Sequence, residues 1–236
     1  MNEHEVGLAH AARLKMNWET NTFEELVYLF VGDAYGNNPM ERLDFIRQEK
    51  RETADEICDT LGVDKNSVVV EIGSGFGFQS KWIAEKVGHL HCFDISKAFL
   101  EQAKKECAGI NTVSFYHIDK QPAELPLKPQ SIDAIFSSAV FIHLNLMDIY
   151  WYLAEFSSVI KPGGKVLFDF LDVDDIDFDK FVQTANYYKE NIANYRHLIN
   201  WNSISAVKKI AEYWKFDVLE INRKSFNTVD ILLRKR

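Results

Sequence analysis

Several features that would mark a membrane, secreted or nucleic-acid-binding protein are missing from this chain of 236 residues. It has no run of about 18 apolar residues, so we expect no membrane-spanning helix and no membrane partner. Its first residues, 1–5, carry neither a basic region nor an apolar core, which is unlike a secretory signal. Acidic residues outnumber basic ones by 35 to 27, and the net charge of −8 argues against a nucleic-acid partner.

Cysteine is also scarce. The three cysteines, Cys58, Cys92 and Cys107, show no spacing typical of metal ligands, so we expect no metal site. Reduced and mostly buried thiols are expected, which favours the reducing compartment of the cytoplasm. A hydrophobic content of 47% and a charged content of 26% are typical of a globular chain, and the length suits one domain with an appendage.

The most informative segment that is present is a glycine-rich turn after an apolar strand. Residues 68–72 read Val-Val-Val-Glu-Ile, which predicts a buried parallel strand. Three glycines then alternate: Gly73, Gly75 and Gly77. They predict a tight turn that a ligand can approach closely, and the apolar spacing over 79–87 predicts a helix after it. A strand, a glycine turn and a helix form the layout that cradles a nucleotide.

A second strand is predicted over 89–95, with Asp94 near its end. Asp94 lies roughly 20 residues after Gly73, where a ribose-binding acid is expected in such folds. A carboxylate suits this place because it accepts hydrogen bonds from both ribose hydroxyls; the alternative is a solvated acid at a strand end. A dehydrogenase fingerprint, Gly-x-Gly-x-x-Gly, would need glycine at position 78, which is Phe78.

The motifs that follow arrive in an order that resembles the class I S-adenosylmethionine-dependent methyltransferases. Segments 113–119 and 131–138 are similar to the third and fourth strands of that family, and 140–144 to its exit from the fourth strand. Residues 159–167, with Pro-Gly-Gly at 162–164, resemble the turn before the fifth strand. Segments 216–221 and 226–233 resemble the final strand pair, so the likeness covers residues 65–236.

The resemblance implies an α/β fold with a Rossmann-like, seven-stranded sheet, mostly parallel with an antiparallel last strand and helices on both faces. Residues 67–236 would form the cofactor-binding domain. Apolar spacing predicts helices within 1–66, an N-terminal cap that would shape the acceptor pocket. The stretch at about 172–203 is longer than an ordinary strand–helix connection and is expected to form a lid-like insertion.

The implied cofactor is S-adenosyl-L-methionine, which leaves as S-adenosyl-L-homocysteine. Its predicted binding residues are Glu71, Gly73, Ser74, Gly75, Gly77, Asp94, Ile95, Asp119, Ser137 and Tyr35. Asp119 would contact the adenine amino group. Glu71 would support the glycine loop indirectly, or cap it by accepting backbone N–H groups. The aromatic residues Trp18, Tyr28 and Tyr35 either line the acceptor pocket or pack in a core.

Methyl transfer is an in-line displacement, so positioning comes first and removal of an acceptor proton second. His143 stands where the chain leaves the fourth strand and is the candidate base; the alternative is that it only packs. Four aromatic residues of the insertion are candidates for acceptor binding: Tyr187, Tyr188, Tyr195 and Trp201. The acids within 172–179 either attract a cationic acceptor or form a solvated helix start.

We therefore predict an enzyme that methylates N, O or C of a small molecule, as a monomer or homodimer. The alternative is a non-catalytic S-adenosylmethionine-binding protein or a subunit of another enzyme. The chain lacks the Asn/Asp-Pro-Pro-Tyr segment of nucleobase amino-methyltransferases and the double-glutamate loop of protein arginine methyltransferases. It also lacks the metal-holding Asp-Asn pair of catechol-type enzymes, although Asp169 and Asp172 lie nearby. No motif identifies the acceptor.

Overall fold

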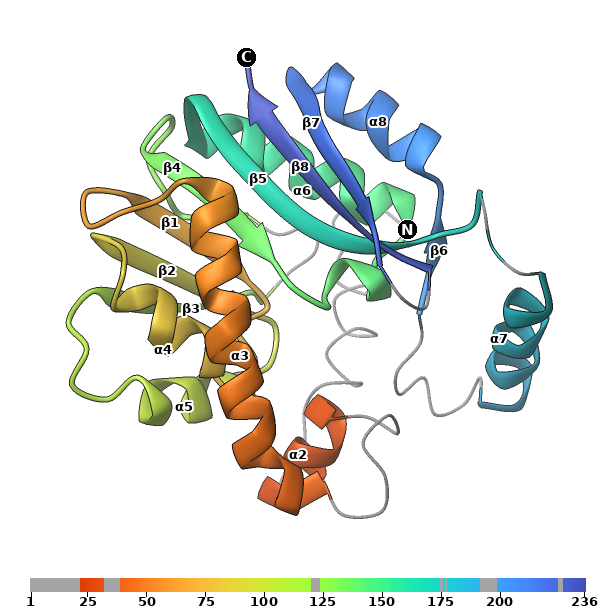
Figure 1. Ribbon diagram of the computed structural model, residues 1–236, viewed down its shortest axis with the longest axis horizontal. Coiled ribbons are helices and arrows are strands. Elements are labelled where there is room, and N and C mark those ends of the chain that lie inside the picture. The colour runs from red at the N-terminus through yellow and green to blue at the C-terminus, as the bar shows by residue number, and fades with distance from the viewer. Residues whose placement is uncertain are drawn as a thin grey trace.

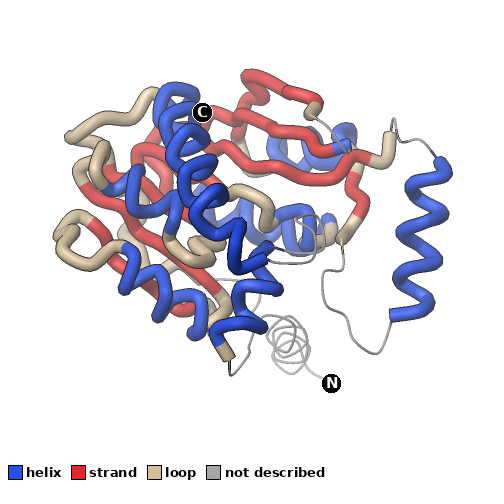
Figure 2. Tube along the Cα trace, turned by 60° about the horizontal axis from the view of Figure 1, so that its bottom comes forward, coloured by secondary structure: helices blue, strands red, loops and turns tan. Residues whose placement is uncertain are grey.

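The structure is a computed structural model that describes residues 22–31, 39–119, 124–174, 176, 178–191, 199–224 and 227–236. A central sheet lies between helices on both of its faces (Figure 1, Figure 2). The elements are α2 (Phe23–Val31), α3 (Pro39–Leu61), β1 (Val68–Ile72), α4 (Phe78–Ala84), β2 (His89–Asp94), α5 (Lys97–Glu106), β3 (Val113–His117), β4 (Ile132–Ser137), η2 (Phe141–His143), α6 (Leu146–Val159), β5 (Ile160–Asp172), α7 (Phe178–Asn191), β6 (Trp201–Asn202), α8 (Ile204–Tyr213), β7 (Phe216–Arg223) and β8 (Thr228–Lys235).

The strand order is β3-β2-β1-β4-β5-β8-β7, with β6 paired to β5 outside this path. The pairs from β3 to β5 are parallel, whereas β8 runs antiparallel to both of its neighbours. This confirms the predicted mostly parallel sheet with a reversed last strand. The described residues form eight strands where seven were expected, because the two-residue β6 adds one.

The strand register places the site. Ile72, the last residue of β1, pairs with Phe93 of β2 and with Ser137 of β4. The carboxyl ends of these three strands therefore meet at one edge of the sheet. The strand order reverses between β1 and β4, and ligands of open α/β sheets bind in the crevice at such a point.

Both faces of the sheet are apolar because every parallel strand is covered on two sides. Helices α6 and α8 cover one face, over a core that includes Phe156 and Phe168. Helices α3 and α4 cover the other, over Ile57 and Ile83. The predicted continuous apolar run of β1 thus serves two separate cores. The three cysteines are buried and free, as predicted.

The helix α2 docks directly on the glycine loop through phenylalanines. The ring of Phe30 lies 5.0 Å from that of Phe76 and 5.7 Å from that of Phe78, both in edge-to-face geometry. Such pairs add to the free energy gained from burial of the rings. The predicted N-terminal helices therefore exist, and one of them is built onto the loop that carries the leading motif.

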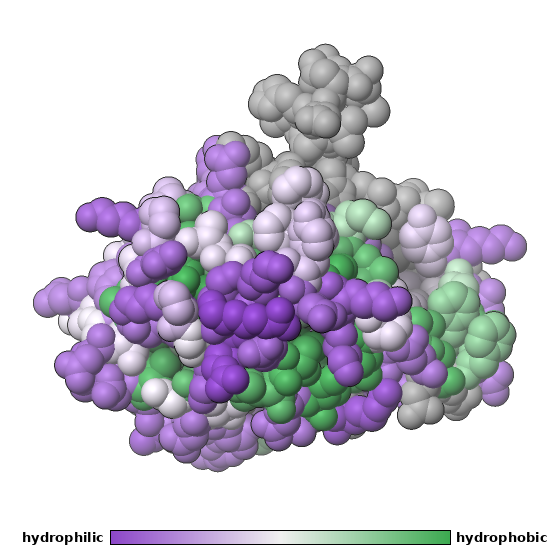
Figure 3. All heavy atoms as spheres, turned by 90° about the horizontal axis from the view of Figure 1, so that it is seen from above, coloured by the Kyte–Doolittle hydropathy of each residue, from purple (hydrophilic) through white to green (hydrophobic). Residues whose placement is uncertain are grey.

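The insertion contains a helix, α7, which stands apart from the sheet (Figure 1, Figure 2). Two of its predicted acceptor-binding residues, Tyr187 and Tyr188, are 41% and 40% exposed. In the part of the chain that the structure describes, no helix is long and apolar enough to cross a membrane. Seen from above, hydrophilic side chains cover most of the described surface, and apolar ones show between them in several places (Figure 3).

The fifth strand begins earlier than the sequence predicted. The Pro-Gly-Gly segment 162–164 was expected to form a turn before the strand, but it lies inside β5. Opposite it the register shifts between Ile132 and Ala134 of β4. Gly163 has a φ of 80°, so the local turn geometry exists as an irregularity of the strand.

A comparison of Gly77, in the glycine loop, with Gly163, in β5, tests how closely the loop is packed. Gly77 and Gly163 have φ values of 77° and 80°, but a Cβ on Gly77 would lie 2.7 Å from Ala103 Cα, and one on Gly163 would meet nothing within 4 Å. Alanine should suffer similar backbone strain at both positions. We expect Gly77→Ala to lower the free energy of unfolding by about 1–3 kcal/mol more than Gly163→Ala, because only the first overpacks. Urea unfolding measures both, and equal losses would contradict the close contact.

Candidate cofactor-binding and active site

The glycine loop, residues 73–77, joins β1 to α4 at the carboxyl edge. Its glycines have φ values of 79°, 51° and 77°, a region that side chains disfavour. The N–H of Gly73 donates to the carbonyl oxygen of Phe93 at 2.7 Å, which ties the loop to β2. A Cβ on Gly73 would lie 2.1 Å from Val140 Cγ2. The loop is therefore a tight turn that glycine alone fits, as the motif predicted, and its role as a cofactor cradle stays a prediction.

Asp94, the last residue of β2, holds the loop from the other side. Its Oδ2 accepts the N–H of Gly75 at 2.8 Å, and its Oδ1 accepts the N–H of Ser96 at 2.8 Å. The residue is 6% exposed, so it is not a solvated strand end. A carboxylate has about four lone-pair sites in all, so this type of side chain can accept hydrogen bonds from backbone N–H groups and from hydroxyl groups.

Glu71 is buried between β1, β2 and α4. It accepts hydrogen bonds from the hydroxyl of Ser80 and, at 3.3 Å, from the thiol of Cys92. Burial raises the pKa of Glu71 to about 7, against the lowering effect of these two donors. The described contacts tie α4 and β2 to β1, which agrees with the predicted indirect support of the loop. They do not include the backbone N–H caps that were the other possibility.

Two polar atoms beside the loop are buried without a hydrogen-bond partner among the described residues. They are Ser74 Oγ and Gln79 Nε2. An unsatisfied buried polar group costs about 1–3 kcal/mol, so these atoms indicate where a polar ligand fits. With Asp94 and the loop backbone, they suit the hydroxyl, ammonium and carboxylate groups of S-adenosylmethionine. Gln79 was not predicted; a buried amide in the first turn of α4 was the available signal.

The predicted residues at the ends of β2, β3 and β4 form different contacts. Ser137 donates its hydroxyl to the carbonyl oxygen of Ile72 at 2.9 Å, so its side chain binds β4 to β1. The carbonyl oxygen of Ile95 accepts from His117 Nε2 at 3.0 Å. The N–H of Ile118 donates to the Asp94 carbonyl oxygen, which brings the exposed Asp119 beside the end of β2. Ile95 and Asp119 therefore flank Asp94, where the adenine end was predicted.

His143 ends the short helix η2 and is half-buried. The side-chain amide of Asn200 donates to the carbonyl oxygen of His143 at 2.7 Å, and that of Asn202 donates to the carbonyl oxygen of Leu144 at 2.9 Å. The end of the insertion is therefore fastened to the exit from β4. The sequence did not predict this contact. Trp201 lies between the two asparagines, and its indole N–H is buried without a partner among the described residues.

The structure describes the side chains of two of the remaining predicted residues, and neither lies at this edge. Tyr187 and Tyr188 lie on α7, which stands apart (Figure 1). Tyr35, Tyr195 and Trp18 lie outside the described residues, as does the side chain of Tyr28. Among the described residues, no group of three or more histidine, cysteine or acidic side chains is placed to hold a metal ion.

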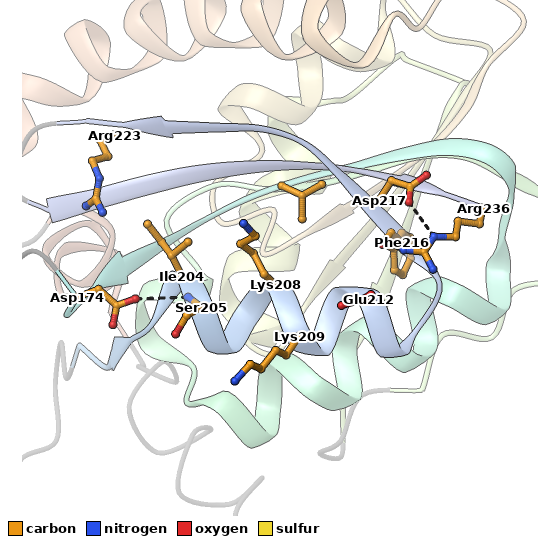
Figure 4. Close-up of a pocket in the computed structure, with 11 residues that line it drawn as sticks. Asp174, Ile204, Ser205, Lys208, Lys209, Glu212, Phe216, Asp217, Arg223 and Arg236 are labelled. Atoms are coloured by element: carbon orange, nitrogen blue, oxygen red, sulfur yellow. Dashed lines mark hydrogen bonds and ion pairs between the residues drawn. The ribbon is translucent and has the colours of Figure 1, made fainter.

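Two hollows adjoin the sheet. One of about 130 Å³ lies beneath α3 and is lined by residues that include Ser137, Ser138 and Asp169 at the carboxyl edge. The other, of about 640 Å³, lies between α8 and β7, and Figure 4 shows its charged lining. There Arg236 pairs with Asp217 at 2.7 Å. None of the predicted site residues lines the larger hollow, so its size does not make it the candidate site.

Glu71 gives folding a pH dependence. Its pKa of about 7 in the folded protein exceeds its ordinary value of 4.5, so the folded state binds the proton more tightly. Its contribution to stability is therefore complete at low pH and is lost as the pH rises from about 4.5 through 7. Glu71→Gln stays neutral, so its stability relative to wild type should increase over this range by up to about 3 kcal/mol.

Urea unfolding of both proteins at several pH values between about 5 and 8 measures this difference. Glu85→Gln, at an exposed position just after α4, controls for the loss of a carboxyl group alone. Stability profiles of Glu71→Gln and wild type that run parallel would contradict the raised pKa.

Comparison with known proteins agrees with this geometry. Residues 70–168 match a family described as a methyltransferase domain, from β1 through most of β5. Over 207 residues the chain is 26% identical to a phosphoethanolamine N-methyltransferase of Plasmodium falciparum, which covers 84% of this chain and 73% of that protein. It is 28% identical to a demethylmenaquinone methyltransferase of Tropheryma whipplei over 110 residues, which are 47% of this chain and 44% of that protein.

Solved structures share the fold at low sequence identity. The magnesium protoporphyrin IX methyltransferase of Synechocystis, with bound S-adenosylhomocysteine, superimposes with a TM-score of 0.65 at 14% identity, covering 90% of this chain and 92% of that one. The geranyl diphosphate C-methyltransferase of Streptomyces coelicolor gives a TM-score of 0.63 at 14% identity, covering 87% of each chain.

The family match covers the glycine loop, Asp94 and the exit from β4. The sheet order, the reversed β8 and the cradle at the carboxyl edge come from the structure itself. On these grounds residues 70–168 form a methyltransferase domain, and the chain has the fold of the class I S-adenosylmethionine-dependent methyltransferases, with S-adenosylmethionine as its cofactor.

Proposed function

We propose that this enzyme methylates a nitrogen atom of a small amine-bearing metabolite. The support comes from the phosphoethanolamine N-methyltransferase, whose alignment with this chain extends beyond the cofactor-binding half that all the relatives share. The phosphoethanolamine N-methyltransferase aligns with 84% of this chain, whereas the demethylmenaquinone methyltransferase aligns with 47%. Regions outside the cofactor half shape acceptor pockets in this family, so a longer match carries more weight for the acceptor.

The observation that carries the location of the acceptor is the contact between the insertion and the exit from β4. Asn200 and Asn202 fasten β6 to the carbonyl groups of His143 and Leu144. The buried indole N–H of Trp201 has no partner among the described residues, and a bound acceptor with an oxygen atom would satisfy it. We place the acceptor between η2 and β6.

The proposal gives each of the predicted site residues a role. Asp94 and Asp119 hold the ribose and the adenine, while the glycine loop with Ser74 and Gln79 binds the amino-acid end. Ile95 and Ser137 shape the strand ends around the cofactor. S-adenosylmethionine supplies an electrophilic methyl group on a good leaving group. His143 takes the proton of the acceptor ammonium, since imidazole changes charge near neutral pH.

The domain organisation is part of the same proposal. Residues 1–66, including Tyr35, cap the cofactor, and the insertion at about 172–203 closes over the acceptor. Tyr187 and Tyr188 are exposed on α7 and would reach the acceptor, with Tyr195, when this segment closes. Buried free cysteines support a cytoplasmic location, and we propose a monomer or homodimer.

A metabolite screen tests the function. Release of S-adenosylhomocysteine from S-adenosylmethionine is followed with primary and methylated amines, with hydroxyl compounds and with carbon acids. We expect turnover with amines. Turnover confined to oxygen or carbon acceptors would overturn the choice of nitrogen.

Asp94 should govern cofactor affinity. Asp94→Asn keeps the size of the side chain but removes the charge that strengthens hydrogen bonds to hydroxyl and N–H groups. We expect the Kd for S-adenosylhomocysteine to rise about 10- to 100-fold, equivalent to about 1.4–2.8 kcal/mol. Calorimetric titration measures it. Asp133→Asn is the matched control, because Asp133 also accepts a backbone N–H, from Val68 at 2.8 Å, but lies near the start of β4. A Kd of Asp94→Asn equal to that of Asp133→Asn would refute the ribose role.

His143 should govern turnover and not cofactor affinity. We expect His143→Ala to lower kcat by about 10²–10⁴ while the Kd for S-adenosylhomocysteine stays close to wild type. The control is His89→Gln, because His89 lies at the start of β2 and bonds Ser114 Oγ at 2.9 Å. Steady-state kinetics with the acceptor from the screen decide between the roles. A loss of stability with an unchanged kcat would show that His143 only packs.

A further inference from the structure

A half-buried carboxylate that the sequence did not place in the site faces the exit from β4. Both oxygens of Asp169, on β5, accept the backbone N–H of Ala139, at 2.8 and 2.9 Å. Ala139 has a φ of 59°, in the left-handed region that alanine rarely adopts. Residues 138–144, which we name the β4 exit, therefore turn through a strained residue, Ala139, whose N–H points at this carboxylate.

The surroundings of Asp169 disfavour its charged form, so packing alone does not explain a carboxylate at this position. Burial raises the pKa of Asp169 to about 6; the N–H of Ala139 lowers this pKa and the neighbouring Asp230 raises it. Asp230 stands directly opposite on β8 and pairs with Lys224 at 2.5 Å. Within the described part of the chain, Asp169 itself forms no ion pair. The charge of Lys50 lowers the pKa of Asp169, but this does not cancel the effect of burial. A half-buried charge without an ion pair lowers stability, so a neutral side chain would serve better if packing were its only role.

The β4 exit connects the cofactor cradle to the candidate base. The side chain of Val140 lies so close to Gly73 that a Cβ there would come within 2.1 Å of Val140 Cγ2. On the other side of Val140 the helix η2 begins, and it ends at His143. The conformation of Ala139 therefore sets both where Val140 meets the glycine loop and where η2 starts.

We propose that Asp169 is a positioning residue for the cofactor site. Its carboxylate holds Ala139 in the left-handed conformation, and this seats Val140 against Gly73 and sets the direction of η2. The inference rests on the cofactor half of the proposed site and is independent of the acceptor. A failed acceptor screen with intact cofactor binding would reject the proposed acceptor and leave this inference standing.

A rescue experiment tests it. Asp169→Asn keeps the size of the side chain but puts a donor where one of the two acceptors stood. We expect the Kd for S-adenosylhomocysteine to rise about tenfold, the loss expected for one hydrogen bond to a charged group. Glycine adopts positive φ without a steric penalty, so adding Ala139→Gly to Asp169→Asn should recover most of this affinity. If Asp169 only filled space, a glycine at position 139 would not restore the cofactor affinity lost in Asp169→Asn.

Two further variants complete the design. Asp230→Asn removes the neighbouring carboxylate, which does not contact Ala139, and should change the Kd less than about twofold; this separates the hydrogen bond from local charge. Ala139→Val leaves Asp169 intact but makes positive φ harder to adopt, so it should weaken binding as well. It also keeps the test decisive if Asp169→Asn does not fold.

Calorimetric titration and circular dichroism on each purified variant give the affinity and the folded state. Wild-type affinity in folded Asp169→Asn would overturn the inference. So would the absence of recovery in the folded double variant, or an equal loss in Asp230→Asn, or wild-type affinity in Ala139→Val.

Discussion

The hydrogen bond from the Gly75 N–H to the carboxylate of Asp94 is the interaction on which the site depends. The same carboxylate accepts the N–H of Ser96, whose hydroxyl in turn caps α5 by accepting from Phe99. One buried acid therefore sets the shape of two consecutive strand-to-helix turns. Because both turns lie at the carboxyl edge, the cofactor meets a surface that is already organised, which limits the entropy lost on binding.

The three glycines of the loop are each met by a different part of the chain. An added Cβ would run into Val140 at Gly73, into Phe30 at Gly75 and into Ala103 at Gly77. Each position therefore needs glycine twice, for its positive φ and for space. The loop is the point where the N-terminal helices, the β4 exit and α5 converge, so displacement of any of them reaches the cofactor cradle.

The catalytic half is held together by backbone carbonyl and N–H groups. Asn200 and Asn202 donate to carbonyl groups next to His143, while Asp169 accepts from Ala139. Side chains from β5 and β6 thus determine the path of a short irregular segment that has few backbone partners of its own. Such segments can adopt several conformations, and this arrangement explains how one of them is selected without a metal ligand or a disulfide in the described residues.

The sequence by itself determined the features that local patterns encode. The apolar run before Gly73 and the spacing of Asp94 were enough to predict a strand, a turn and an acid at the end of the next strand, because periodicity and glycine conformations are properties of neighbouring residues. The resemblance in motif order extended this to the parallel sheet and its reversed last strand, and α3 lies within residues 1–66, where the apolar spacing predicted helices.

Only the tertiary structure decided which side chains meet across long separations. Glu71 bonds Ser80 and Cys92 where backbone caps had also been considered, and Asp169 reaches Ala139 from 30 residues away. The two asparagines approach η2 from the far end of the insertion. A strand pattern specifies which face a residue occupies, but the pairing of strands distant in sequence sets its partner. The early start of β5 and the short β6 escaped prediction for the same reason, since both depend on a neighbouring strand.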